Sequence, residues 1–456
     1  MAKFICSLLA LLAFSTPAVQ AETLADALIA AYRNSNLLDQ NRAVLRAADE
    51  DVAIAVSTLR PVVAYALQAG YSRAEFLDGL GNTSVNEGLN ASIALTADLT
   101  VLDFGRNALA IDVAKESVLA TREALVGVEQ GVLLAAVQAY VDVRLAQEIV
   151  ALRQSNLRLI TQELRASNDR FEVGEITRTD VSIAEARLAA SRASLAAAEG
   201  DLMVARESYK AATGAYPGRL AGLPLPPKTA QSLEDAQAVA ARTHPSIRQA
   251  QHDVAVADLN VARGKASMTP NLTARASLSV DNDGLDAQSL GLNMTQTLYA
   301  GGRLSALYRQ ALAGRDASRA GLHQTSLLVA QSVGNAWSSL LVSAASIEAS
   351  GLQITAAQTA FEGVRDEAAL GARTTLDVLD TEQDLLDARA SRLQAEARRY
   401  TGVYVLLSTM GLLTVDHLQL GIPTFDPAGY YNAVKRAPAT SAQGRRLDKI
   451  LEKIGN

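Results

Sequence analysis

Two aspartates one helical turn apart, Asp377 and Asp380, form the group best suited to chemistry in this sequence. They lie in the stretch GARTTLDVLDTEQDLLDARASRL, which has no helix breaker after Gly371, so both carboxylates fall on one helical face. In a monomer such a face is simply hydrated. If three copies surround an axis, the pair becomes two stacked acidic rings, which is the usual way to build a cation-attracting constriction in a pore. The elements that position the two aspartates decide between these interpretations.

No other residues point to catalysis or to a metal site. His244 and His252 lie on an expected helix without acidic or cysteine partners at metal-ligand spacing, and His323 and His417 stand alone. No Ser, His and Asp arrangement and no phosphate-binding glycine loop stands out. We therefore expect neither an enzyme nor a bound cofactor.

The composition favours long helices. Of the 456 residues 49% are hydrophobic and only 4% aromatic, and the formal net charge is −6. These values exclude a disordered chain, and a basic patch interleaved with aromatics, as in nucleic-acid binders, is absent. Abundant Ala, Leu, Gln, Arg and Glu are typical of helices whose backbones approach closely.

Residues 1–21 have the pattern of a secretory signal peptide. A short basic region precedes the apolar run Phe4 to Phe14, and small residues including Ala21 precede the expected cleavage site. A membrane anchor is the weaker interpretation, because the run is too short to span a bilayer. Cys6 lies inside it, so we expect a mature chain without cysteine. We also expect no transmembrane helix in the mature chain.

The sequence contains an internal duplication. Leu24, Asp26 and Pro61 recur 209 residues later as Leu233, Asp235 and Pro270. Further along, the offset is 197 residues and pairs Gly105 with Gly302, Arg106 with Arg303, Tyr140 with Trp337, Gly174 with Gly371, Asp180 with Asp377, and Gly214 with Gly411. The fall from 209 to 197 means that the second half is 12 residues shorter between its proline and its glycine. A period this long indicates a duplicated structural unit rather than a solenoid.

Each repeat is expected to contain a helix, a β-hairpin and a long helical hairpin. The boundaries are 22–229 for the first repeat, with a β-hairpin at 62–102 and a helical hairpin at 106–212, and 230–411 for the second, with a β-hairpin at 271–299 and a helical hairpin at 303–410. In both repeats the first helix, 23–59 or 232–267, ends before a proline. Residues 412–456 follow and end in a charged helical pattern at 445–454. We expect this segment either to pack outside a helical barrel near its equator or to be partly disordered.

Strict alternation marks the strands. Apolar and polar residues alternate over Ser92 to Val101 and over Asn271 to Val280, which predicts strands with one apolar and one polar face. The alternation alone is equally consistent with the sheet of a soluble domain. Strands of about ten residues also span a bilayer, and four cannot close alone, so three chains sharing about twelve strands is the natural membrane solution.

The helical hairpins carry coiled-coil spacing. Seven-residue steps place Val181, Leu188, Leu195, Leu202 and Tyr209 in one return helix, and Leu379, Leu386, Leu393, Tyr400 and Leu407 in the other. This spacing implies a left-handed supercoil, with each long helix pairing to its return helix across the tips 174–177 and 371–374. An isolated cytoskeletal coiled coil would not explain the signal peptide or the strands.

At this point the chain resembles the TolC family of outer-membrane efflux and secretion channels. The resemblance covers nearly all of the mature sequence and includes the duplicated halves, the segment TQTLYAGGR from Thr295 to Arg303, the tip FEVG ending at Gly174, and GARTTLDVLD from Gly371 to Asp380. It implies an α plus transmembrane β fold: a homotrimer with a shared 12-stranded β-barrel continuing into a periplasmic α-helical barrel.

The resemblance also assigns roles to particular residues. Asp377 and Asp380 match the aspartates of the entrance rings, and Arg373 matches a basic residue that links to the neighbouring hairpin in the closed entrance. Thr179 and Asp180 match its partners there, and such a charge-assisted contact would act as a gate latch. The alternative for Arg373 and Asp180 is an exposed pair of little energetic weight. The chain departs from the family at Ala368, where an aromatic partner for Asp180 is expected.

The tips resemble a docking surface for periplasmic adaptor (membrane fusion) proteins. Its residues would be Gly174, Glu175 and Ile176 with Gly371, Ala372 and Arg373, although any helical hairpin needs a glycine-rich turn. The implied function is the exit duct of a tripartite efflux pump or type I secretion system in the outer membrane, working with an inner-membrane transporter of the ABC, RND or MFS class. The alternative is a non-conducting structural or adhesive coiled coil that spans the envelope and is anchored by its strands.

Overall fold

The structure is a computed structural model that describes residues 21–436 except 78, 80, 82, 283 and 285, together with residue 449. Most of the predicted signal peptide and of the charged pattern at 445–454 therefore lies outside the described residues. The chain divides into two units. The tip unit takes the described parts of Met1–Asn36, Glu129–Ala236 and Val333–Ile422, and the sheet unit takes those of Leu37–Val128, Gln237–Ser332 and Pro423–Asn456.

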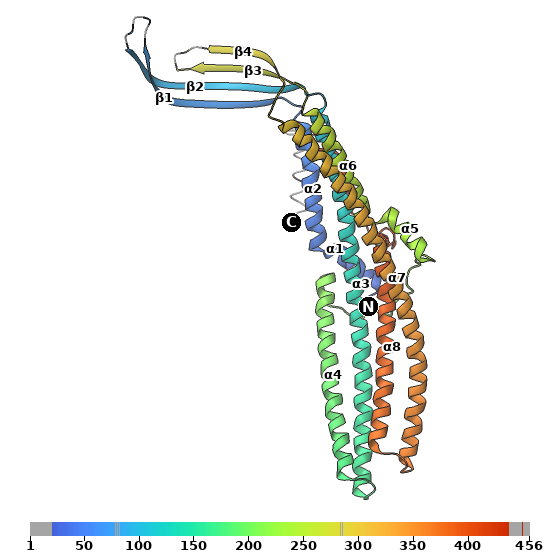
Figure 1. Cartoon of the computed structure of the whole chain (residues 1–456). Coiled ribbons are helices and arrows are strands. Elements are labelled where there is room, and N and C mark those ends of the chain that lie inside the picture. Colours follow the sequence, from blue (N-terminus) through green and yellow to red (C-terminus); the bar gives the residue numbers. More distant parts are fainter. Residues whose placement is uncertain are drawn as a thin grey trace, which may run out of the picture. The chain divides into compact units, whose positions relative to one another are not determined.

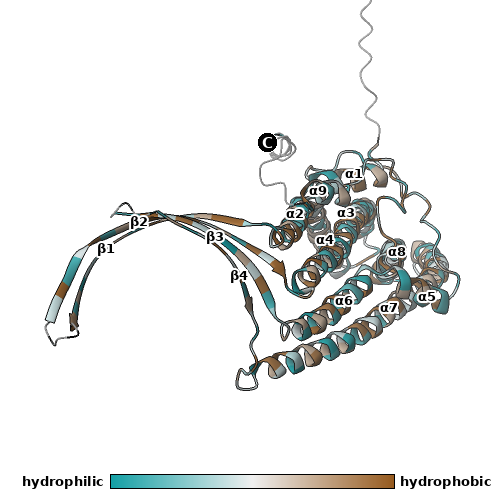
Figure 2. Cartoon of the chain, turned by 90° about the horizontal axis from the view of Figure 1, so that it is seen from above, coloured by the Kyte–Doolittle hydropathy of each residue, from teal (hydrophilic) through white to brown (hydrophobic). Residues whose placement is uncertain are grey.

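The sheet unit contains an open, four-stranded antiparallel sheet in the order β1-β2-β3-β4. The strands are β1 (Val62–Leu77), β2 (Thr83–Leu102), β3 (Asn271–Asp281) and β4 (Asp286–Thr295). The two β-hairpins expected from the sequence thus pair with each other through β2 and β3. The sheet is strongly curved (Figure 2), and within the described chain β1 and β4 remain edge strands.

The register keeps the two faces of the sheet chemically distinct. One row across all four strands joins Ala64, Thr96, Ser277 and Ser289, and the next row on the opposite face joins Val63, Ala97, Ala276 and Leu290. The polar face also carries a cross-strand ion pair between Arg275 Nε and Asp98 Oδ1 at 2.6 Å. Alternation of side chains along each strand therefore gives the sheet one polar and one apolar face, as the sequence pattern predicted.

The first β-hairpin is much longer than the second. Pairing between β2 and β3 ends at Ser92 and Asp281, whereas β1 and β2 stay paired as far as Leu77 and Thr83. The end of the shared ladder is closed by Asn282, whose side chain accepts from the Ala91 N–H at 3.2 Å and donates to the Leu89 carbonyl at 2.8 Å. The residues missing from the second repeat are thus missing from the free end of its hairpin (Figure 1).

The helices are α1 (Leu24–Asn34), α2 (Asn36–Ser57), α3 (Arg106–Glu172), α4 (Arg178–Thr213), α5 (Leu233–Thr243), α6 (Pro245–Ala266), α7 (Arg303–Ala369), α8 (Thr375–Thr409) and α9 (Pro427–Val434). The first helix expected in each repeat is interrupted once. The breaks fall at Ser35 and His244, which are related by the offset of 209, and both residues are extended, with ψ of 107° and 124°. At His244 the cause is the following Pro245, because the residue before a proline is driven out of the helical region.

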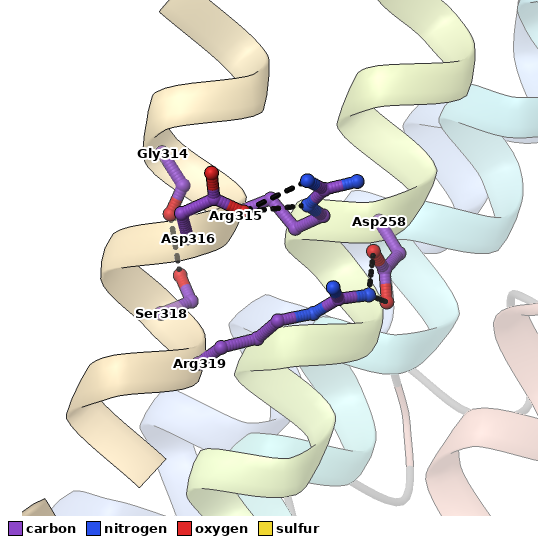
Figure 3. Close-up of polar contacts among 6 residues, drawn as sticks. All are labelled: Asp258, Gly314, Arg315, Asp316, Ser318 and Arg319. Atoms are coloured by element: carbon purple, nitrogen blue, oxygen red, sulfur yellow. Dashed lines mark hydrogen bonds and ion pairs between the residues drawn. The ribbon is translucent and has the colours of Figure 1, made fainter. Parts of the chain in front are cut away.

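In the sheet unit, the described C-terminal segment packs on helices. Leu45, Val52 and Val118 form a core against which Phe425 and Tyr431 lie, so α2, α3 and α9 share one cluster. Helices α6 and α7 are joined by an ion pair between Asp258 and Arg319 at 3.0 Å, while the neighbouring Arg315 pairs with Asp316 on its own helix (Figure 3). The first pair links α6 to α7, whereas the second lies within α7.

In the tip unit, α4 returns antiparallel to α3 and α8 returns antiparallel to α7 (Figure 1). The predicted heptad residues of the return helices are largely buried, among them Val181, Tyr209, Leu379 and Leu407. One core cluster joins Ile160 of α3 to residues of α4 and to Leu379 of α8, so the two hairpins pack against each other. The burial follows from the seven-residue spacing, which keeps one stripe of each helix facing its partners.

Two helices are long and apolar enough to cross a membrane by length and composition alone, which leaves our expectation of no transmembrane helix untested. Both α3 and α7 contain an 18-residue window with the apolar content and low charge of a membrane span. In α3, 44% of that window is buried, as in a core helix, whereas only 11% is buried in α7. Within the tip unit the exposed apolar residues of α7 include Leu341, Val342 and Leu352. This helix therefore presents an apolar surface that the single chain does not cover.

Candidate functional site

The candidate site lies at the tips of the two helical hairpins, which have the same backbone turn. Gly174 and Gly371 adopt left-handed conformations with φ of 79° and 77°. The N–H groups of Gly174 and Glu175 donate to the last carbonyls of α3, and those of Gly371 and Ala372 do the same for α7. Glycine suits this position because a side chain is strained there. The repeat-related tips are thus two copies of one helix stop.

The aspartates Asp180 and Asp377 are helix-capping residues. In α4 the Asp180 carboxylate accepts from the N–H of Thr177 at 2.9 Å and from its hydroxyl at 2.7 Å. In α8 the corresponding distances from Thr374 to Asp377 are 3.0 and 2.9 Å. These hydrogen bonds hold the pKa of both carboxyls below the usual range, so both side chains are anionic and fixed in orientation.

The capping role was missed in the sequence, although the signal was present. Threonine or serine followed three residues later by an acid, just before an apolar run, predicts a capping box. The motif also begins α1, where Thr23 pairs with Asp26, and the Ser232 hydroxyl accepts from the Asp235 N–H before α5. The duplicated aspartates therefore mark helix starts in both repeats. Asp377 caps its helix whether or not it also lines a channel entrance.

Asp380 lies one turn beyond Asp377 and has a different partner. Its carboxylate forms an ion pair with Arg187 of α4, which joins the two helical hairpins. The side chains of Arg187 and Asp380 are 35% and 55% exposed, so the pair is in contact with solvent. The sequence did not reveal Arg187, because its partner is 193 positions away and no local pattern connects them.

The structure does not bring the predicted latch residues together. The Arg373 Nε donates to Glu367 at 2.8 Å across the turn of its own hairpin. Asp180 is held by Thr177, and Thr179 is exposed without a side-chain partner in the described chain. Ala368, at the position where an aromatic was expected, is 6% exposed and packs with Phe361 and neighbouring apolar residues.

A buried polar network lies next to the ion pair and was also missed in the sequence. Glu382 accepts a hydrogen bond from the Asn156 amide, and the Asn156 carbonyl oxygen accepts from the Ser191 hydroxyl at 2.8 Å. All three side chains are more than 90% buried and come from α8, α3 and α4. Burial raises the pKa of Glu382 to about 7; the Asn156 hydrogen bond opposes the rise, Glu163 adds to it, and Arg187 opposes it.

The docking residues predicted at the tips are accessible. Gly174, Glu175, Gly371 and Ala372 are exposed, and Ile176 is half-buried. Two apolar neighbours not singled out from the sequence, Val173 and Leu370, are 71% and 87% exposed. They occupy repeat-related positions and give each tip a small apolar surface beside its glycine.

No group of three or more His, Cys, Asp or Glu side chains suited to a metal ion occurs in the described part of the chain. His244 caps α6 through its ring, accepting from the Ser246 N–H at 3.2 Å, and His252 contacts Glu116 at 2.8 Å. Both histidines therefore have structural partners.

The family model for outer membrane efflux proteins matches residues 28–215 and 238–412 of this chain. The chain belongs to this family. The outer membrane efflux protein BepC of Brucella suis is 34% identical over 425 residues, which cover 92% of this chain and 91% of BepC. The proteases secretion protein PrtF of Dickeya chrysanthemi is 27% identical, with coverage of 90% and 92%.

Solved structures of other outer-membrane proteins have the same fold. The CusC channel superposes with a TM-score of 0.76 at 19% identity, covering 86% of this chain and 92% of CusC. VceC of Vibrio cholerae gives a TM-score of 0.73 at 19% identity, with coverage of 85% and 96%. This chain is thus a TolC-family protein of the outer membrane with a large periplasmic helical portion.

Proposed function

We propose that this outer membrane efflux protein is one subunit of a trimeric channel-tunnel, gated at its periplasmic entrance, which serves as the exit duct of a tripartite efflux pump or type I secretion system. The observation that carries the proposal is the open sheet with one apolar and one polar face. In a bilayer its edge strands need partners, because unpaired backbone groups are too costly in hydrocarbon. Three chains supply about twelve strands, enough to close a barrel with a polar lumen.

The uncovered apolar surface of α7 supports the same assembly. Leu341, Val342 and Leu352 are each more than 60% exposed in the single chain. A monomer with such a surface is prone to association, whereas neighbouring subunits in a helical barrel would cover it. This is the reason to prefer a trimer over a single chain anchored by its strands.

The entrance of the proposed duct is formed by the hairpin tips. Asp377 and Asp380 would project towards the axis as the constriction, and Arg373 would reach Thr179 and Asp180 of the neighbouring hairpin as the latch. Because Arg373 already pairs with Glu367 within its own hairpin, we propose that latching exchanges one acidic partner near the surface for another. Such an exchange has a small energetic difference, which suits a gate that a partner protein must open.

The partners are proposed from the tips and from the relatives. The glycine turns at 174–176 and 371–372, with exposed Val173 and Leu370, offer a surface for a periplasmic adaptor protein. PrtF is a proteases secretion protein and BepC an efflux protein, so an inner-membrane transporter of the ABC, RND or MFS class would supply the cargo. The family consists of channel proteins, so we propose no enzymatic activity and no cofactor.

The test is single-channel recording of the purified protein in planar bilayers, with a divalent cation titrated from the periplasmic side. We expect a small, cation-preferring conductance that the divalent ion blocks. The variant Asp377→Asn with Asp380→Asn should weaken both preference and block. A protein that inserts but never conducts, even with Arg373→Ser to loosen the latch, would support the non-conducting envelope-spanning alternative instead.

A further inference from the structure

We infer that Arg187 of α4 determines the charge of the entrance: it neutralises Asp380, so that of the two aspartates Asp377 is the one that supplies uncompensated negative charge there. The inference rests on the proposed function, because it concerns the constriction of the proposed duct. It assigns unequal roles to two aspartates that sequence and resemblance treat as equivalent.

The geometry separates the two aspartates. Asp380 forms an ion pair with Arg187, a cation from the other hairpin of the same chain. Asp377 is held by the backbone and hydroxyl of Thr374, which are uncharged donors, and the nearby Arg373 is paired with Glu367. Asp380 therefore has a cation in direct contact, whereas Arg373 acts on Asp377 only from a distance while it pairs with Glu367.

The position of Arg187 is set by packing on both sides of it. The next residue, Leu188, and Ala184 one turn earlier belong to the cluster that contains Leu379, the neighbour of Asp380. Around them, the buried network of Glu382, Asn156 and Ser191 joins α8 to α3 and α4. Because these contacts hold α4 against α8, the pairing of Arg187 with Asp380 does not depend on the two exposed side chains alone.

The ion pair itself contributes little to stability, since both side chains are in contact with water. Its effect on permeation is different in kind. A passing cation responds to the sum of nearby charges, and an arginine in contact with the carboxylate removes most of the attraction at that level. In a trimer the level of Asp380 is then close to neutral, while the level of Asp377 carries one negative charge per subunit.

The duplication shows that the arginine belongs to one hairpin only. At the offset of 197, the counterpart of Arg187 is Asp384 and the counterpart of Asp380 is Ile183. Neither the acid nor its cation is thus a property of the repeat as a whole. The pair is therefore specific to this contact between α4 and α8.

The experiment measures reversal potential and divalent block in planar bilayers for four proteins: wild type, Arg187→Gln, Asp380→Asn and the double variant. Arg187→Gln should strengthen cation preference and lower the half-blocking concentration about tenfold, because it exposes a unit charge within a few ångströms of the ion. Asp380→Asn should weaken both, since it leaves Arg187 unpaired. The double variant should return to wild-type behaviour.

A matched control is Arg192→Gln, which removes a positive charge from the exposed surface of the same helix five positions further on. It should leave selectivity and block unchanged. If wild type conducts and Asp377→Asn weakens the block, but Arg187→Gln behaves as wild type, the inference is wrong and the proposed function stands.

A second measurement tests the proximity of Arg187 and Asp380 without recording a current. The variant Arg187→Cys with Asp380→Cys should be bridged within one chain by a bifunctional thiol reagent long enough to replace the arginine side chain, because the ion pair is longer than the reach of a direct disulfide. The bridge is detected by mobility on a denaturing gel and by mass spectrometry. Cross-linking between chains, or none, would overturn the inference. If wild type does not conduct, the proposed function and the charge role of Arg187 both fail, whatever the cross-link shows about the pairing.

Discussion

The two hairpin tips are copies of one local structure, yet they carry different side-chain chemistry. Both have a left-handed glycine followed by a capping box, at Gly174 and Asp180 in one and at Gly371 and Asp377 in the other. Within two turns the copies diverge. Glu382 is 6% exposed in a polar network, whereas its counterpart Glu185 is half exposed and lies 3.7 Å from Arg178.

The comparison shows that the two copies share the features that backbone hydrogen bonding requires. They differ in the features that depend on contacts with neighbouring helices. The turn and the cap satisfy backbone groups of their own helix, and these needs are the same in both copies. The burial of Glu382 depends on α3 and α4 packing against α8, and no equivalent arrangement surrounds Glu185. Three expected outcomes test this contrast between the shared backbone features and the differing side-chain contacts.

The largest effect is expected for Leu379→Ala. Leu379 is 1% exposed in the cluster between the hairpins, while its counterpart Ser182 is exposed. Losing buried side-chain volume at Leu379 should lower the free energy of unfolding by about 2–5 kcal/mol. Denaturant unfolding followed by circular dichroism measures the loss. Ser182→Ala is the matched control and should change little; equal losses at both positions would contradict the asymmetry.

A pH-dependent effect should distinguish Glu382 from Glu185. Burial raises the pKa of Glu382 from 4.5 to about 7, so the folded protein holds this proton more tightly than the unfolded chain. Its contribution to stability is therefore full below about pH 4.5 and is lost as pH rises through about 7. Ionising Glu382 should cost at most about 3 kcal/mol.

The measurement is the unfolding free energy of wild type and Glu382→Gln between about pH 5 and pH 8. Glu382→Gln should reduce the decline with pH, because the amide stays neutral and can still contact Asn156. Glu185→Gln should show the same dependence of the unfolding free energy on pH as wild type. If the unfolding free energy of Glu382→Gln falls with pH as much as that of wild type, other groups cause the decline.

The smallest effect should be equal in the two tips. Thr177→Ala and Thr374→Ala each remove a capping hydroxyl, and each should lower stability by about 1 kcal/mol. Thermal unfolding of the two variants side by side checks this. Thr→Ser at the same positions keeps the hydroxyl and should retain wild-type stability. A clear difference in stability between the two alanine variants would show that the caps have also diverged.

The sequence by itself determined the duplicated repeat, the order of strands and helices, the two faces of the sheet and the buried heptad stripe. These features follow from periodicity, which records the environment of each residue along its own element. The breaks at Ser35 and His244 were missed, although Pro245 marked one of them. The capping boxes at Asp180 and Asp377 were also readable from local spacing and were assigned another role.

Only the tertiary structure decided the partners of the charged groups. Arg187 and Asp380 lie 193 positions apart, and their pairing depends on which hairpins adjoin and how each helix is rotated. The same holds for the buried Glu382, whose partner Asn156 lies on another helix. Arg373, by contrast, pairs with Glu367 across the turn of its own hairpin. A charge has no periodic signature, so its partner is known only when the packing of the elements is known.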